Sequence, residues 1–171
     1  LCSVAKGWNE SAKVGQGGKL VGIKRVLGLV ASPTEQDYQS AVMTYEYRSE
    51  GIFIDQHRTT SLSIHSDGTV TIDDAPHGLP ARRLLYKMSQ QQVRELVDAF
   101  YRIEYFSLDE AYETKRVGLS VSHVSDIDTV ITSISTHSRE KRVRIYWGAP
   151  HELSDLEKLI ACTVLEPGLR D

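Results

Sequence analysis

The chain has 171 residues, of which 40% are hydrophobic and 25% charged, values typical of one globular domain with a sizeable core. Its formal net charge is −3 and its Lys and Arg residues are scattered, which argues against nucleic acid or an anionic membrane as the partner. The best apolar run, residues 19–31, is interrupted by Lys24 and Arg25 and is shorter than the roughly 20 residues of a membrane-spanning helix. We therefore expect a soluble protein with no transmembrane span.

The N-terminal region is rich in Gly, Ser and Lys, and we expect residues 1–18 to form an irregular arm before a single domain at 19–171. The segment GQGGK (15–19) does not have P-loop spacing, because Lys13 and Leu20 stand where that motif needs Gly and Ser or Thr. The chain starts at Leu1 rather than Met, which suggests that a leader or a longer N-terminus has been removed.

The chain has two cysteines, Cys2 and Cys162. They can form one bridge between the N-terminus and the last predicted helix, and Cys2 can alternatively carry a lipid anchor. The bulky Leu1 stands where lipoprotein processing normally needs a small residue. Both alternatives remain open at this point.

Short β-type segments dominate the first half of the chain. Residues 19–31 predict one strand or two short ones, and 32–37 predict a turn or the start of a helix. Alternating side chains predict a half-buried strand at 41–49, which 52–54 can continue after Gly51.

The stretch SLSIHSDGTVTIDD (61–74) predicts a β-hairpin, and its apolar pattern selects the loop. A three-residue loop at 66–68 pairs Ile64 with Val70 and places all the polar side chains on the opposite face. A two-residue loop would mix apolar and polar residues on both faces. Gly68 stands where the left-handed residue of such a turn belongs, so Asp67 and Gly68 are predicted to be structural turn residues.

The rest of the chain alternates strand and helix patterns. Ser89, with Gln92 three residues later, forms a capping box before a helical apolar repeat, which predicts a helix at about 89–104. Pro150 and the apolar stripe after it predict a second helix at about 150–163. The predicted strands are 82–88, 128–135 and 142–147, and the predicted loops are 73–81, 104–113 and 136–141. This order predicts an α+β fold, an antiparallel sheet with both helices packed on one face.

The ordered segments SIHSDGTVTID, IEYFSLDEAYE, SDIDTVITSIS and RVRIYWGAPHELSDLEKLI resemble an uncharacterised bacterial domain family over about residues 42–166. Members of that family are classed as a domain of unknown function and are mostly secreted or lipid-anchored envelope proteins. Many of them have a Cys-x-Gly-x-Cys-Pro segment before the first hairpin, whereas this chain has GIFIDQHRTT (51–60) there. A redox or metal role of that segment therefore does not transfer, and the resemblance implies a fold and an extracytoplasmic location.

Metal binding is the first chemistry that the sequence suggests. The candidate ligands are His57, His65, Asp73 and His77, because imidazole and carboxylate groups suit zinc or a similar divalent ion. They lack the short spacing of an HExxH motif, so we interpret them as solvent-facing polar residues and expect no cofactor.

Other chemistries have weaker sequence support. The carboxylates after the first helix and before the strand at 128–135 are better explained as loop charges than as a glycosidase pair. No G-x-S-x-G motif or activated cysteine predicts nucleophilic catalysis. The tyrosine-rich composition suggests an interaction surface or half-buried packing, with candidates Tyr45, Tyr47, Tyr146 and Trp147.

We therefore expect a non-catalytic binding or structural module of the bacterial cell envelope, with another envelope protein as its partner. The alternative is a metal-dependent hydrolase that uses the region of His57, His65 and His77. An enzyme needs these groups in one concave pocket, whereas a binding module needs a broad exposed surface.

Overall fold

The computed structural model describes residues 31–49, 57–117, 120–123, 128–146 and 148–168. Its helices are α2 (Glu35–Ser40), α3 (Gln90–Arg102) and α4 (His151–Gly168), with a short 3-10 helix η2 (Tyr105–Ser107). Its strands are β1 (Val42–Ser49), β2 (Arg58–His65), β3 (Thr69–Pro76), β4 (Arg82–Lys87), β5 (Ala111–Tyr112), β6 (Thr114–Val117), β7 (Ser120–His123), β8 (Thr129–Ser135) and β9 (Glu140–Ile145).

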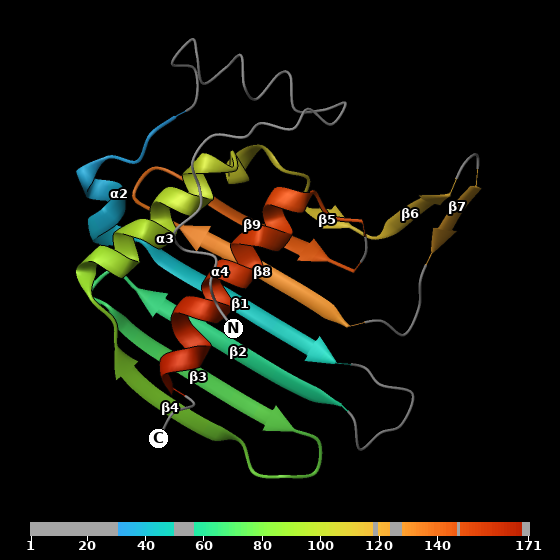
Figure 1. Cartoon of the computed structure of the whole chain (residues 1–171), viewed down its shortest axis with the longest axis horizontal. Helices are drawn as coiled ribbons and strands as arrows, with labels where there is room; N and C mark the ends of the chain where they lie inside the picture. Colours follow the sequence, from blue (N-terminus) through green and yellow to red (C-terminus); the bar gives the residue numbers. More distant parts are fainter. Residues whose placement is uncertain (1–30, 50–56, 118–119, 124–127, 147, 169–171) are drawn as a thin grey trace.

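Seven strands form one sheet in the order β4-β3-β2-β1-β8-β9-β5 (Figure 1). All neighbours pair antiparallel except β5, which runs parallel to β9. β6 and β7 form a separate hairpin that projects beyond β5. The predicted α+β class and the largely antiparallel sheet are confirmed. The predicted strands at 19–31 and 52–54 and the arm at 1–18 lie outside the described residues, apart from Ala31.

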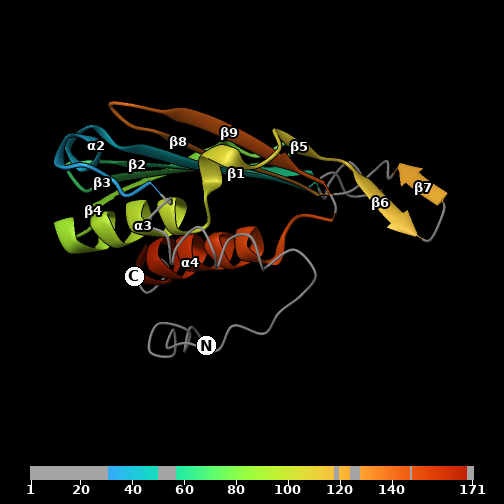
Figure 2. The same ribbon diagram turned by 90° about the horizontal axis from the view of Figure 1, so that it is seen from above.

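Helices α3 and α4 lie side by side on one face of the sheet, so the domain has two layers (Figure 2). The core between them comes from alternate residues of the strands and from the apolar stripes of both helices. Its largest fully buried side chains include Met43, Ile64, Leu96, Phe100, Tyr105, Ile134, Leu153 and Ile160. None of the described helices combines the length and the apolar character needed to cross a bilayer.

Polar contacts hold helix α2 against the end of the sheet. The carboxylate of Asp37, only 2% exposed, accepts hydrogen bonds from the backbone nitrogen of Thr34 at 2.9 Å and from the hydroxyl of Ser138 at 2.8 Å. Burial opposes ionisation, but the hydrogen bonds from Thr34 and Ser138 outweigh it and hold the pKa of Asp37 well below its usual range. Arg94 on α3 also pairs with Glu35 of α2. These bonds tie α2 to the turn between β8 and β9 and to α3.

The predicted hairpin register is confirmed, with Leu62 opposite Ile72 and Ile64 opposite Val70. Gly68 has a φ of +84° and its nitrogen donates to the carbonyl of His65 at 2.9 Å, as the three-residue turn requires. The carboxylate of Asp67 accepts from the backbone nitrogen of Thr69 at 2.8 Å, and this bond is the main reason why its pKa falls to about 2.

Several element boundaries differ from the sequence predictions. Strand β3 continues to Pro76, so the loop to β4 is shorter than the predicted 73–81. Strand β9 begins at Glu140 inside the predicted turn, because Glu140 pairs with Ser135. The two-residue strand β5 was not predicted, since its pairing with β9 depends on a contact distant in sequence. The β6–β7 hairpin was also not predicted.

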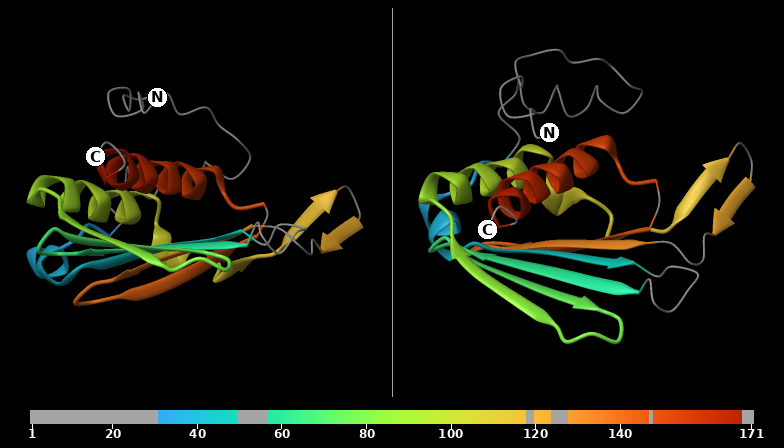
Figure 3. Two further views of the ribbon diagram at one scale, coloured as in Figure 1. Left: turned by 90° about the horizontal axis from the view of Figure 1, so that it is seen from below. Right: turned by 60° about the horizontal axis from the view of Figure 1, so that its bottom comes forward.

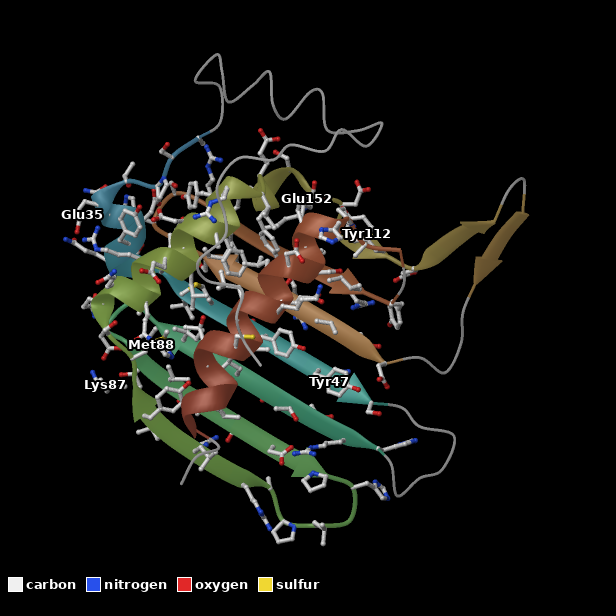
Figure 4. The ribbon with its side chains drawn as sticks, in the orientation of Figure 1. Glu35, Tyr47, Lys87, Met88, Tyr112 and Glu152 are labelled. Carbon is white, nitrogen blue, oxygen red and sulfur yellow. The ribbon has the colours of Figure 1, made fainter. Side chains whose placement is uncertain are left out.

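Addition of a single methyl group at Gly68 should destabilise the fold strongly. An added Cβ would lie 2.4 Å from the carbonyl oxygen of Met88, the residue that leads from β4 into α3 (Figure 4). We expect Gly68→Ala to lower the free energy of unfolding by about 2–4 kcal/mol, because a backbone clash is added to left-handed strain. Urea denaturation measures this change.

Gly78→Ala is the matched control, because Gly78 also has a positive φ, +71°, but a Cβ there meets nothing within 4 Å. This variant should lose only about 1–2 kcal/mol, the strain of the left-handed conformation alone. Equal losses in the two variants would contradict the proposed clash with Met88.

One buried carboxyl group opposes the packing of α4. Glu157 lies on α4 between the apolar residues of its buried stripe, and its Oε1 atom is buried without a hydrogen-bond partner. Burial raises the pKa of Glu157 from 4.5 to about 7. The phenol groups of Tyr45 on β1 and Tyr105 on η2 are close enough for electrostatic coupling to this carboxyl.

We expect Glu157→Gln to stabilise the protein by about 1–2 kcal/mol at about pH 8 and to have little effect at about pH 4. The carboxyl group of Glu157 binds its proton more tightly in the folded protein than in the unfolded chain. The wild-type free energy of unfolding therefore falls as the pH rises from about 4.5 to about 7, and Glu157→Gln removes this loss. Thermal unfolding across this range measures the effect. Glu152→Gln, at the exposed start of α4, is the control and should give no such pH-dependent gain.

Candidate functional site

In the described part of the chain, no helix covers the second face of the seven-stranded sheet (Figure 3). We call this surface the open face. Strand alternation places most apolar residues of β1, β2, β3 and β8 against the helices and leaves mainly hydroxyl and charged side chains, with Ile131, on the open face. Both hollows described below lie along it.

The strand registers align four hydroxyl side chains in one row across the open face. Thr44 of β1 lies opposite both Ser133 of β8 and Ser63 of β2, and Ser63 lies opposite Thr71 of β3. We call these four residues the hydroxyl row. It spans roughly 14 Å at the usual spacing of neighbouring strands. The hydroxyl oxygens of Thr44 and Ser133 are 2.6 Å apart and share a hydrogen bond.

The hydroxyl row forms the floor of a central hollow of about 400 Å³. Its side chains are short, whereas long charged side chains stand on both sides of it. The remaining open-face side chains of the hollow include Ser61, Glu46, Asp73, Glu140, Arg142 and Ile131. The hollow therefore offers many hydrogen-bond donors and acceptors, with Ile131, 4% exposed, as its apolar part.

Three of the charged side chains of the central hollow, Asp73, Glu46 and Arg142, take part in ion pairs. Asp73 accepts two hydrogen bonds from the guanidinium of Arg83, at 2.6 and 3.0 Å, and this pairing lowers the pKa of Asp73. Glu46 pairs with Arg48 at 2.5 Å and with Arg142 at 3.8 Å. A ligand in this hollow therefore meets a nearly neutral surface rather than a strong electric field.

A terminal hollow of about 340 Å³ continues along the same sheet at the end of β1 and the start of β2. The rings of His57 and His77 meet there edge to face, with centroids 6.0 Å apart, and the backbone nitrogen of His77 donates to the carbonyl of His57 at 2.8 Å. Arg58 also lines the hollow, and its guanidinium makes two hydrogen bonds of 2.7 Å with Asp74.

The structure brings together two of the four predicted metal-ligand candidates. His57 and His77 are neighbours, but His65 ends β2, roughly 25 Å from the start of that strand at the usual rise per residue. Asp73 belongs to the central hollow and pairs with Arg83. The described residues contain no group of three or more His, Cys, Asp or Glu side chains placed to hold a metal ion.

The candidate interaction tyrosines do not gather on the open face. Tyr45 packs against the core on the helix side, and burial raises its pKa to about 12. The hydroxyl of Tyr47, at the end of β1, donates to Asp128 at 2.5 Å (Figure 4), and this bond raises the pKa of Tyr47. Tyr146 is half-buried beside β5, where its nitrogen donates to the carbonyl of Tyr112 at 2.9 Å. Trp147 lies outside the described residues.

Two of the carboxylates after α3, Glu110 and Glu113, each lie beside a basic residue of β9. Glu110 lies 3.8 Å from Lys141, and Glu113 lies 4.0 Å from Arg144. Cys162 on α4 is disulfide-bonded, and Cys2, the only other cysteine in the sequence, lies outside the described residues.

The sequence analysis missed the hydroxyl row, although part of its signal was present. The alternation of Ser61, Ser63, Thr69 and Thr71 with apolar residues was recognised, but only as the polar face of one hairpin. Thr44 and Ser133 join this row through pairings with distant segments, which local patterns do not encode. The exposed leucines of β4 were missed for the same reason, whereas the position of Glu157 between Leu153 and Ile160 is a local signal that was overlooked.

Comparison with known proteins identifies a family but no activity. No curated protein matches the chain. The model of the family described as Domain of unknown function (DUF6438) matches residues 58–163, which include strands β2 to β9, helix α3 and most of α4. Because this match covers more than half of the chain, the protein belongs to the DUF6438 family.

Proposed function

We propose that this domain is a non-catalytic binding module of the bacterial cell envelope and that the open face binds a neutral, hydroxyl-rich ligand, a saccharide chain. The observation that carries the proposal is the hydroxyl row on the floor of the central hollow. Hydroxyl groups donate and accept hydrogen bonds, so they complement the hydroxyl groups of a sugar in many orientations.

The charge pairing on the open face supports an uncharged ligand. Asp73 and Glu46 already have arginine partners, so their charges are largely compensated and offer a charged ligand in the central hollow little net attraction. A polypeptide strand suits the face less well, because extended peptides bind through backbone groups at a sheet edge. The backbone groups of central strands are already paired within the sheet.

The positions of the titratable groups support binding rather than catalysis. General acid–base chemistry needs at least one proton donor or acceptor with a tuned pKa beside the substrate. Glu157, whose pKa is raised to about 7, lies on α4, on the opposite side of the sheet from both hollows. The disulfide at Cys162 supports the envelope location, because disulfides persist mainly in oxidising compartments.

The metal-dependent hydrolase is the second candidate, and the neighbouring His57 and His77 are the observation in its favour. Native mass spectrometry with and without added zinc separates the two functions. A zinc ion that is bound by the purified protein and lost in His57→Ala and His77→Ala would favour the hydrolase. A ligand site confined to the central hollow would favour the binding module.

Titration with a soluble N-acetylglucosamine oligomer, and separately with a neutral glucose oligomer, tests the saccharide site by NMR. We expect the amide signals of Thr44, Ser63 and Ser133 to shift. The affinity should be only millimolar, because the open-face side chains of the described strands include no Phe, Tyr or Trp to stack on a sugar ring. Ser63→Lys fills the hollow and should reduce binding by at least about tenfold.

Ser107→Lys is the matched control, because Ser107 is exposed on η2, away from the central hollow, and this variant should bind like the wild type. Folding of both variants is checked by thermal unfolding. Shifts that map outside the open face, or a folded protein that binds neither oligomer, would contradict the saccharide proposal.

A further inference from the structure

Strand β4 forms one edge of the seven-stranded sheet (Figure 1). Within the described residues it pairs with β3 on one side only, over Arg82 to Lys87. An edge strand presents a row of backbone N–H and C=O groups to any strand that lies beside it. The geometry of β4 is therefore suited to strand addition.

Exposed apolar side chains concentrate at this edge. The exposed large hydrophobic residues of the described chain are Leu84 (46% exposed) and Leu85 (69%) on β4 and Leu79 (65%) in the loop before it. Leu84 and Leu85 are consecutive, so they point to opposite faces of the sheet. A strand added to β4 would cover part of both side chains, whereas a ligand on one face would cover only one.

The same edge is basic. Strand β4 has the sequence RRLLYK, with Arg82 and Arg83 before the two leucines, Lys87 after them, and no acidic residue. Arg83 and Lys87 pair with Asp73 and Asp67, which lie on the inner side of β4. A strand on the outer side would lie about 4.8 Å from β4 and about twice as far from β3, so it would be nearer to the cations of β4 than to the carboxylates that partly compensate two of them.

These charges disfavour two possible occupants. An antiparallel copy of β4 centred on the two leucines would bring Arg82 beside Lys87 of the second copy, and like charges in opposite positions destabilise a strand pair. Residues 1–30 of the same chain contain five basic residues and one acidic residue, so they are also poorly matched to β4. Cations on an edge strand are a known device against self-association.

We propose that β4 binds, by strand addition, an extended segment of another protein that has two central apolar residues flanked on both sides by acidic residues. The apolar pair packs beside Leu84 and Leu85. The acidic groups lie beside Arg82 and Arg83 at one end and beside Lys87 at the other. This site lies outside the central hollow, which no residue of β4 lines, and it gives the domain a protein partner in addition to the proposed saccharide.

Two synthetic peptides test the proposal with the full chain. One contains Val-Leu flanked on both sides by Glu and Asp, and the other has Lys in place of every acidic residue. We expect the acidic peptide to bind at least about tenfold more tightly in calorimetry and to lose affinity as salt is added, because screening weakens exposed charge pairs. The amides of Leu84 and Leu85 should show the largest NMR shifts and gain protection from hydrogen exchange.

Variants locate the site and exclude a general charge effect. Arg82→Glu and Leu85→Ser should each weaken the acidic peptide by at least about tenfold. Lys158→Glu, the same change of charge sign on the exposed surface of α4, should leave the affinity unchanged. Thermal unfolding confirms that each variant is folded.

Three results would overturn the proposal. The first is equal binding of the lysine peptide, and the second is a set of shifts that maps to the open face. The third is a wild-type dimer in sedimentation analysis that Leu85→Ser dissociates, which would assign the edge to a second copy. None of these results depends on whether the open face binds a saccharide.

Discussion

The turn at residues 66–68 decides which side of the sheet each side chain of β2 and β3 faces. Gly68 adopts the left-handed conformation that makes this turn possible, and its carbonyl accepts from the nitrogen of Met88 at 2.9 Å. The same glycine therefore sets the register of the hairpin and holds the entry to α3. A slip of one residue would turn Leu62 and Ile64 outward and bury Ser63 beneath the helices. The apolar core and the polar open face both depend on this one turn.

Because the described helices cover only one face of the sheet, the contacts that join the two layers all lie on that side. Leu153, Leu156 and Ile160 bind α4 to the sheet through apolar contact, and the hydroxyl of Tyr86 adds a hydrogen bond of 2.5 Å to the carbonyl of Val164. Glu157 opposes this packing once it is ionised. The attachment of α4 to the sheet therefore depends on pH near neutrality.

Local chemistry was enough to predict much of the fold. The capping box of Ser89 and Gln92 begins α3 as expected, and the apolar alternation at 61–74 predicted the hairpin register residue by residue. The strand order was not predictable, because β1 lies between β2 and β8 through pairings that span most of the domain. The site depends on that order. Thr44 and Ser133 are 89 positions apart in the chain, and their hydrogen bond is formed only when the sheet is complete.

The open face and the β4 edge recognise ligands by different groups. On the open face, the backbone groups of the central strands are paired within the sheet, so a ligand would contact side chains only. Most of these side chains are short and carry hydroxyl groups, and ion pairs lie around them. At the edge, a ligand would meet backbone groups that no other described strand pairs with, beside leucines and cations. A saccharide suits the first surface and an extended acidic strand the second. The hydroxyl row lies on β1, β2, β3 and β8 and the proposed edge site lies on β4, with Arg83 of β4 paired to Asp73 between them, so the two proposed ligands would contact different strands.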